Sequence, residues 1–483
     1  MNIFTIFHLL GVLLLIFSLS LLPPLFVSWL YQDGIFIPFL TSFVLVIAIG
    51  FIFWLVSFNR RRTMSANDGF IIVSMFWIAL SIIGALPFML SKTPHMNLTD
   101  ALFESVSGLT TTGATVLVGL DSLPKSILYY RQQLQWLGGM GIIVLAVAVL
   151  PMLGIGGVQL FKNEIAGPVK NTKLHPKIAE TAKALWRIYA GLTLICALCY
   201  WLAGMDGFDA LCHAFSTIAI GGFSTHDASM GYFNSSLIEI IACFFMLIAG
   251  MNFALHFGAF KSRTLRHYLQ NAELRLYLFI LAFVSILIVI NLLQNKTFES
   301  FDRTLIQGIF HTISIGTTTG FTTTDFYNWS GFAAILLLFT SFIGGCAGST
   351  GGGIKVVRFM LLIKQGIREI NQLIHPDACY QIRIGKQIIS PKIINTVWGF
   401  FALYVASYIL MYLALAATGL DLITAFSAVG ASINNLGPGL GEVGLNYANI
   451  NDTAKWILSF GMLLGRLEIF TLLVILSPEF WHR

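Results

Sequence analysis

Ten apolar stretches, most of about 20 residues, constrain the fold of this chain more than any other feature. A helix of about 20 apolar residues spans the ~30 Å hydrocarbon core of a bilayer. Only 10% of the residues are charged, against roughly 25% in a soluble domain. We therefore predict an all-α polytopic membrane protein. The predicted spanning helices lie near residues 4–30, 36–57, 69–90, 131–151, 185–204, 235–258, 275–294, 331–362, 394–418 and 455–477.

The lysines and arginines predict the orientation in the membrane. Most of them lie in four segments, residues 57–68, 157–187, 259–275 and 355–392. Basic segments next to spanning helices stay in the cytoplasm, so we expect both termini there. The N-terminus has no basic region before its first apolar run, so we expect that helix to be retained rather than cleaved as a signal peptide. Most acidic residues lie on the opposite side and predict a negative outer mouth that attracts cations.

Four short polar turns, each centred on a glycine, interrupt this apolar sequence. Each follows a short apolar run that predicts a half-helix, and each precedes a long apolar helix. Non-helical backbone survives at membrane depth only where it is buried in protein or lines a water-filled cavity. The candidate residues of the turns are Thr111, Thr112 and Gly113; Ile220, Gly221 and Gly222; Thr318, Thr319 and Gly320; and Asn435, Leu436 and Gly437.

The four turns belong to an internal repeat. Their central glycines are separated by 109, 98 and 117 residues. An aspartate stands at the start of each half-helix (Asp100, Asp209, Asp302 and Asp421), and we expect it to cap the helix N-terminus. Each half-helix would then direct its negative C-terminal end toward the middle of the membrane, where four such ends favour a cation.

This repeat predicts the domain organisation. Two extra N-terminal helices occupy residues 1–66, outside the fourfold scheme. Four pore repeats follow at residues 67–157, 158–260, 261–365 and 366–483, and the third contains a broken second helix.

The glycines of the turns have a specific task. Inward-pointing carbonyls on successive residues require positive φ angles, which glycine adopts at little steric cost. Rings of such carbonyls replace the hydration shell of a cation. The four turns differ in sequence, which predicts looser selectivity than a filter built of four identical loops.

Several motifs resemble those of the Trk/Ktr/HKT superfamily of potassium transporters. The segments are ESVSGLTTTGAT (104–115), AIGGFSTHD (219–227), GGCAGSTGGG (344–353) and GRLE (465–468). The resemblance covers essentially the whole chain, and the two added N-terminal helices are similar to those of the TrkH branch.

The resemblance implies potassium uptake across the bacterial inner membrane by a homodimer. It also implies a cytosolic nucleotide-binding regulator of the TrkA type, with the nucleotide on that subunit, and K⁺ as the transported ion. In this family the filter glycines govern selectivity. Plant relatives with serine at the first position favour sodium, so Gly113 favours potassium.

A second candidate site is a glycine-rich interruption of the eighth helix. Glycine runs break helices and free backbone carbonyls, which need a partner or water inside a membrane. The resemblance implies a gating loop directly under the filter. Its candidate residues are Gly344, Gly345, Gly348, Ser349, Thr350, Gly351, Gly352 and Gly353.

Arg466 is the candidate partner of this loop. A cation inside a spanning helix costs a few kcal/mol and usually faces a cavity. Arg466 follows Gly437 by 29 residues, and Ser349 follows Gly320 by the same number. If the two helices run alike, Arg466 reaches the depth of the loop and binds its freed carbonyls. A salt bridge to a distant acid is the alternative.

Two other functions compete with a potassium pore. A membrane-embedded enzyme is disfavoured because the loops repeat one another and carry no nucleophile–base set or HExxH motif. A sodium-permeable transporter, or a symporter coupled to protons or sodium, shares the same predicted fold. The six cysteines do not resemble a disulfide framework, and the CxxC pair of Cys196 and Cys199 is interpreted as small buried side chains because it lies within an apolar span.

The first test is potassium uptake in bacteria that lack their own uptake systems. We expect the wild-type chain to restore growth on low potassium. Gly113→Ser should restore it less well or make the cells sodium-sensitive, because a side chain enters the filter. If the wild type still fails once a regulatory partner is supplied, the assignment to potassium is wrong.

Overall fold

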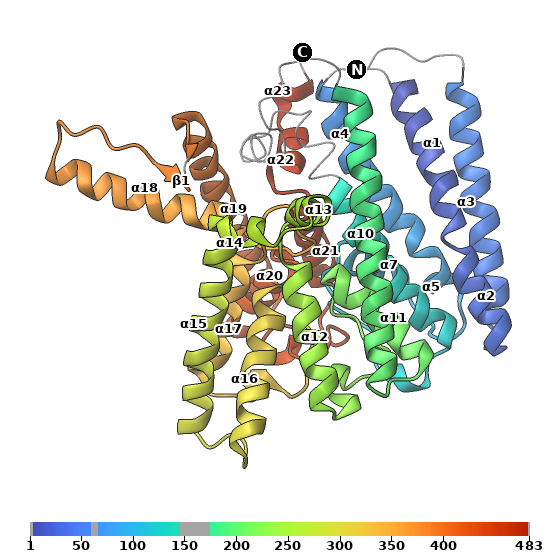
Figure 1. Ribbon diagram of the computed structural model, residues 1–483. Helices are drawn as coiled ribbons and strands as arrows, with labels where there is room; N and C mark the ends of the chain where they lie inside the picture. Colours follow the sequence, from blue (N-terminus) through green and yellow to red (C-terminus); the bar gives the residue numbers. More distant parts are fainter. Residues whose placement is uncertain (1–2, 59–65, 145–173, 386, 482–483) are drawn as a thin grey trace.

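The computed structural model describes residues 3–58, 66–144, 174–385 and 387–481, and these are almost entirely helical (Figure 1). By length and composition, six helices in these ranges are able to cross a membrane, or up to eight if two bent pairs each count as one span. The all-α membrane architecture predicted from the apolar runs is therefore confirmed. The N-terminal pair consists of α1 (Ile3–Leu19), which continues into α2 (Leu22–Tyr31), and α3 (Phe36–Ser57).

Four units with the same order of elements follow this pair. In each, a long helix leads into a half-helix, a polar turn, a loop containing a short 3₁₀ helix, and a second helix. The first comprises α4 (Ala66–Gly84), α5 (Leu86–Leu90), α6 (Leu98–Leu109), η1 (Leu120–Ser122) and α7 (Lys125–Val144). The second comprises α10 (Leu174–Leu202), α11 (Gly207–Ala219), η3 (Ser229–Phe233), α12 (Ser236–Ala249), α13 (Phe253–Ser262) and α14 (Arg266–Gln270).

The third and fourth units repeat this order. The third comprises α15 (Ala272–Gln294), α16 (Phe301–Gly316), η4 (Phe326–Asn328), α17 (Gly331–Ile343) and α18 (Val356–Ile374). Helix α18 projects sideways from the bundle (Figure 1). Two antiparallel strands of two residues each, β1 (Arg383–Ile384) and β2 (Gln387–Ile388), follow it. The fourth comprises α19 (Pro391–Ala417), α20 (Leu422–Ile433), η5 (Gly441–Val443), α21 (Asp452–Arg466), α22 (Phe470–Leu476) and α23 (Pro478–Trp481).

The helix predicted over 331–362 is broken, as expected. Two further helices that were predicted to be continuous are broken as well. The prediction of one helix over 235–258 is wrong, because α12 and α13 meet at 90°. The prediction over 455–477 is wrong too, because α21 and α22 meet at 115°. The amide oxygen of Asn252 caps the new helix at the first break, and consecutive left-handed residues, Glu468 and Ile469, turn the chain at the second. Each bent pair is still apolar enough to pass as one span, so hydropathy does not register the breaks.

The half-helices begin earlier than the sequence predicts. Of the four predicted aspartates, only Asp421 is itself the N-cap. Its carboxylate accepts hydrogen bonds from the backbone N–H groups of Ile423 and Thr424 at 3.1 Å. The other three caps lie two or three residues before the predicted aspartates, because Asn and Ser also accept a bond from the first turn. Carboxylates in that turn still complement the positive end of the helix dipole. The observed caps are Asn97, Asp206 and Ser300, and Asp100, Asp209 and Asp302 lie in the first turn.

Buried ion pairs and hydrogen bonds join the units. Glu104 on α6 and Arg131 on α7 form a fully buried pair at 2.7 Å, and Arg131 also donates to the carbonyl of Ser224 in the second unit. Lys455 on α21 pairs with Asp100 on α6 at 2.7 Å, which joins the last unit to the first. The four units therefore form a closed arrangement rather than a row.

Some predictions fall outside the described residues. They are the end of the fourth helix near residue 151, the boundary at residue 157, and much of the basic segments 57–68 and 157–187. All six cysteines are described and are free thiols.

The buried pair of Glu104 and Arg131 generates a test of stability. Replacing Glu104 by Gln leaves the buried guanidinium without its counter-charge, which we expect to cost roughly 3–5 kcal/mol. The double variant Glu104→Leu/Arg131→Met should be more stable than this single variant, because it removes both charges. Thermal unfolding in detergent measures the difference. A single variant as stable as the wild type would contradict the expected role of the pair.

Candidate ion-selectivity filter and gating loop

The four polar turns share one backbone conformation. In each, a left-handed residue is followed by one ordinary residue and then by a left-handed glycine. The first left-handed residues are Thr111, Ile220, Thr318 and Asn435, with φ between 53° and 68°. The glycines are Gly113, Gly222, Gly320 and Gly437, with φ between 79° and 96°. Only glycine occupies the second position without a steric cost from its Cβ.

The turns contact one another in cyclic order. A Cβ on Gly113 would lie 2.1 Å from the carbonyl oxygen of Gly221, and one on Gly222 would lie 2.1 Å from that of Thr319. A Cβ on Gly320 would lie 2.1 Å from the carbonyl oxygen of Leu436.

A Cβ on Gly437 would lie 2.7 Å from the carbonyl oxygen of Thr112. This contact between the fourth turn and the first closes the cycle. The twelve predicted filter residues are thus brought together in one ring by backbone contacts that exclude side chains.

Some carbonyls of the ring are free to bind an ion. Those of the four left-handed residues that open the turns accept no hydrogen bond from the described part of the chain. These residues are buried, and a buried carbonyl normally has a partner. Oxygens of this kind can replace the hydration shell of a cation.

Side chains pin the turns in different ways. In the first turn the hydroxyls of Thr110 and Thr112 are 2.7 Å apart, and in the third those of Thr317 and Thr319 are 2.8 Å apart. In the fourth, the hydroxyl of Tyr447 donates to the carbonyl of Gly437 at 2.7 Å.

Two acidic side chains bind His226, which follows Gly222 of the second turn by four residues. His226 contacts Asp121 at 2.5 Å and Asp209 at 3.0 Å. Burial alone would lower the pKa of His226, but its hydrogen bonds to the two carboxylates and their charges raise it on balance. The same bonds lower the pKa of Asp121 against the effect of burial. Through His226, these ion pairs link Asp121 of the first unit to the second unit.

The glycine-rich loop at residues 344–353 packs against three of the four units. Gly344 is left-handed, and a Cβ there would lie 2.2 Å from the carbonyl oxygen of Gly352, so the loop folds tightly on itself. A Cβ on Gly345 would lie 2.7 Å from the Ser349 hydroxyl, which donates to the carbonyl of Cys346. Gly348 accepts a hydrogen bond from the backbone N–H of Phe253 at the break in the second unit.

The end of the loop lies directly against the filter turns. The backbone N–H of Gly352 donates to the Thr318 hydroxyl at 2.7 Å, and that of Gly353 to the carbonyl of Asn434 at 3.2 Å. A Cβ on Gly351 would lie 2.8 Å from the carbonyl oxygen of Thr317. The loop therefore closes one side of the ring.

Arg466, 2% exposed, reaches this loop. Its guanidinium donates to the carbonyl of Thr350 at 3.0 Å, the contact that the spacing of the two helices predicts. A second bond, to the carbonyl of Gly138 on α7 at 3.1 Å, was not predicted. No acid pairs with it among the described residues, and Glu468 instead pairs with Arg358 at 2.5 Å. Arg466 thus ties the loop to the first unit.

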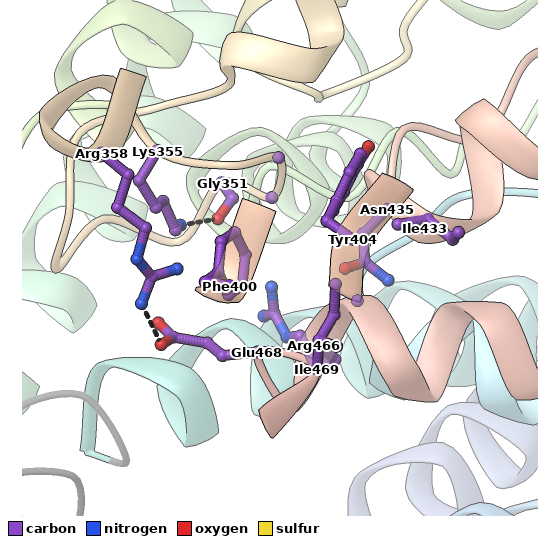
Figure 2. Close-up of a pocket in the computed structure, with 13 residues that line it drawn as sticks. Gly351, Lys355, Arg358, Phe400, Tyr404, Ile433, Asn435, Arg466, Glu468 and Ile469 are labelled. Atoms are coloured by element: carbon purple, nitrogen blue, oxygen red, sulfur yellow. Dashed lines mark hydrogen bonds and ion pairs between the residues drawn. The ribbon is translucent and has the colours of Figure 1, made fainter. Parts of the chain in front are cut away.

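A small cavity lies beside Arg466, and Figure 2 shows residues that line it. The cavity lined by the loop, Arg466 and Asn435 has a volume of about 20 Å³, room for little more than one water molecule. Lys355 points into it and donates to the carbonyl of Gly351, and the Arg358–Glu468 pair closes its far side (Figure 2). The loop and the residues around it therefore leave little free space next to the fourth turn in this conformation.

Sequence reasoning missed several of these side chains. Lys355 was assigned to a basic cytoplasmic segment, and its place next to the glycine run was the available signal. Asn252, Arg358 and Tyr447 gave no signal, because their roles depend on partners far away in sequence. Among the described residues, no three His, Cys, Asp or Glu side chains lie close enough together to hold a metal ion.

The ring contacts generate a test at Gly320. In Gly320→Ala the added methyl would overlap the carbonyl of Leu436, so we expect ion transport to fall at least about tenfold through displacement of the turn. Gly366→Ala on α18 is the matched control, since nothing lies within 4 Å of its Cβ. Flux per folded protein in liposomes measures both. Equal flux in the two variants would contradict the ring geometry.

Comparisons with known proteins agree with this geometry. The family model described as "TrkH: Cation transport protein" matches residues 37–483. The Trk system potassium uptake protein TrkH of Vibrio parahaemolyticus is 53% identical, with 99% of each chain covered, and that of Escherichia coli K12 is 50% identical over the full length of both. TrkG of E. coli K12 is 42% identical, with 98% of each chain covered.

A solved structure gives the same result. The crystal structure of the potassium transporter TrkH from V. parahaemolyticus superposes with a TM-score of 0.93 at 51% identity and covers 100% of both chains. The match of the family model over most of the chain and the full-length similarity to these relatives show that this chain belongs to the TrkH family of cation transport proteins.

Proposed function

We propose that this chain carries potassium into the bacterial cell through the ring formed by its four polar turns. The observation that carries this proposal is the cyclic contact of the four filter glycines, which brings backbone oxygens from four units to one place. The relatives with about half of their residues identical are named potassium uptake proteins. We place the protein in the inner membrane with both termini in the cytoplasm, as the basic segments predict.

The proposed mechanism relies on fixed backbone dipoles. A potassium ion sheds water at the outer mouth and binds the carbonyl oxygens of the turns instead. The C-terminal ends of α6, α11, α16 and α20 lead directly into these turns and add negative potential there. No proton transfer or covalent step is needed.

The loop at residues 344–353 is the proposed gate. Its contacts with Thr318 and Asn434 support a position across the ion path, and the narrow cavity beneath supports a closed conformation. Arg466 holds the loop through Thr350 and adds a positive charge that opposes a cation. Opening requires the loop to leave these partners.

The regulator and the oligomer are further parts of the proposal. A cytosolic nucleotide-binding subunit of the TrkA type would act on the cytoplasmic segments, which include the basic stretch at residues 355–392. The projecting helix α18 exposes several isoleucines on its surface, which supports contact with a second copy in a homodimer. Coupling to protons or sodium is the alternative mechanism, and K⁺ and Na⁺ flux measurements with imposed gradients distinguish it.

Flux of each ion into liposomes tests the proposed function. Purified protein should carry K⁺ down its gradient and carry Na⁺ more slowly. Uptake of K⁺ only when a proton or sodium gradient is imposed would favour the symporter. Absence of K⁺ flux with and without the regulator would contradict the proposal.

The gate generates a prediction at Arg466. In Arg466→Ala the loop loses its bond through Thr350 and the positive barrier, so we expect K⁺ flux to rise several-fold. Arg368→Ala is the control, because its pair with Glu369 is exposed and distant from the loop. Unchanged or lower flux in a well-folded Arg466→Ala protein would contradict a gating role.

A further inference from the structure

The second filter turn lacks the side chains that pin the other turns. The positions of Thr110 and Thr112 in the first turn, and of Thr317 and Thr319 in the third, carry paired hydroxyls. The corresponding positions in the second turn are Ala219 and Gly221, which have no polar side chain. This turn also contains two adjacent glycines, Gly221 and Gly222, and glycine has the widest choice of backbone conformations.

Gln135 on α7, in the first unit, supplies the missing bonds. Its amide N–H donates to the carbonyl of Gly221 at 2.6 Å. Its amide oxygen accepts from the Ser216 hydroxyl at 2.6 Å and from the backbone N–H of Phe223 at 3.1 Å. One fully buried side chain thus binds the half-helix, the turn and the strand-like segment after it.

The contact is as close as the packing allows. A Cβ on Gly221 would lie 2.4 Å from the side-chain carbon of the Gln135 amide. The glycine at the position of Thr112 therefore makes room for a side chain from another unit.

The third unit uses the corresponding position in the same way. Gln135 lies three residues before Gly138, and Ser341 lies three residues before Gly344, at matching places in their helices. The hydroxyl of Ser341 accepts a hydrogen bond at 3.0 Å from the side-chain amide of Asn434, in the turn of the next unit. In both cases the second helix of one unit holds the filter turn of the following unit.

We propose that Gln135 is a positioning residue for ion selectivity, which fixes the carbonyls of the second filter turn without contacting the ion. This inference rests on the proposed function of the ring as a potassium filter. The Gly221 carbonyl also meets Gly113 of the first turn, so Gln135 sets the spacing between two turns of the ring. Without these bonds the second turn can move, and the ring can then fit a smaller cation such as Na⁺.

The test compares Gln135→Met with Gln132→Met. Methionine has a similar length and helix propensity but makes no amide hydrogen bonds. Gln132 is the matched control, because it lies on the same helix, is equally buried, and its amide has no partner among the described residues. The readout is the ratio of K⁺ to Na⁺ flux in liposomes, which does not depend on the amount of folded protein.

We expect the flux ratio to fall about five- to tenfold in Gln135→Met, because one well-placed bond is worth about that factor. The ratio in Gln132→Met should stay at the wild-type value. An unchanged ratio in Gln135→Met, or equal losses in both variants, would overturn the proposal. If the wild-type protein carries no K⁺, the result contradicts the proposed potassium transport instead.

A second variant covers the case in which Gln135→Met does not fold. Ser216→Ala leaves Gln135 in place and removes one of the three hydrogen bonds that orient its amide. A reduced flux ratio in this variant supports the proposal, and the wild-type ratio overturns it.

Discussion

The structure depends on the close approach of four backbone turns that leave no room for side chains. A methyl group on three of the four filter glycines would overlap a carbonyl of the next unit by more than 1 Å relative to normal contact. Such an approach needs left-handed backbone at two positions of each turn, and it needs every unit to be held at a fixed distance from its neighbours. The half-helices, the broken second helices and the buried charges all serve this spacing.

Because the ring is built from one chain, its sides need not be alike. Threonine hydroxyls pin the first and third turns, Gln135 holds the second, and Asn434 and Tyr447 hold the fourth. Charges bind the units outside the ring, as in the contact of Lys455 with Asp100 between the last and first units. A pseudo-symmetric ring can therefore tolerate unequal sequences, provided that each turn finds its own support.

The loop beneath the filter shows how glycine permits both packing and release. Gly351 and Gly352 fit against carbonyls of the third and fourth turns, where a Cβ would collide. The polar contacts of the loop come from backbone groups and from the side chains of Glu273, Thr318, Ser349, Thr350, Lys355 and Arg466. A segment held by directional bonds of this kind is suited to switch between two arrangements.

Much of this organisation is readable in the sequence, because it is encoded locally. Apolar length predicts the spans, and glycine within polar turns predicts where left-handed backbone is required. Equal spacing from two turns predicts the contact of Arg466 with the loop. The breaks at Gly250 and Glu468 are not readable from hydropathy, because each bent pair is apolar enough to pass as one span. The partners of Gln135 and Arg358 are not readable either, since they are set by how distant helices pack.

Anomalous diffraction from crystals grown with rubidium or thallium tests most directly whether a cation binds inside the ring of four turns. These ions replace potassium, and their anomalous scattering distinguishes them from water. The account predicts a peak enclosed by the four turns, near the carbonyl oxygens of Thr111, Ile220, Thr318 and Asn435. Ordered peaks elsewhere in the membrane domain, with none inside the ring, would contradict it.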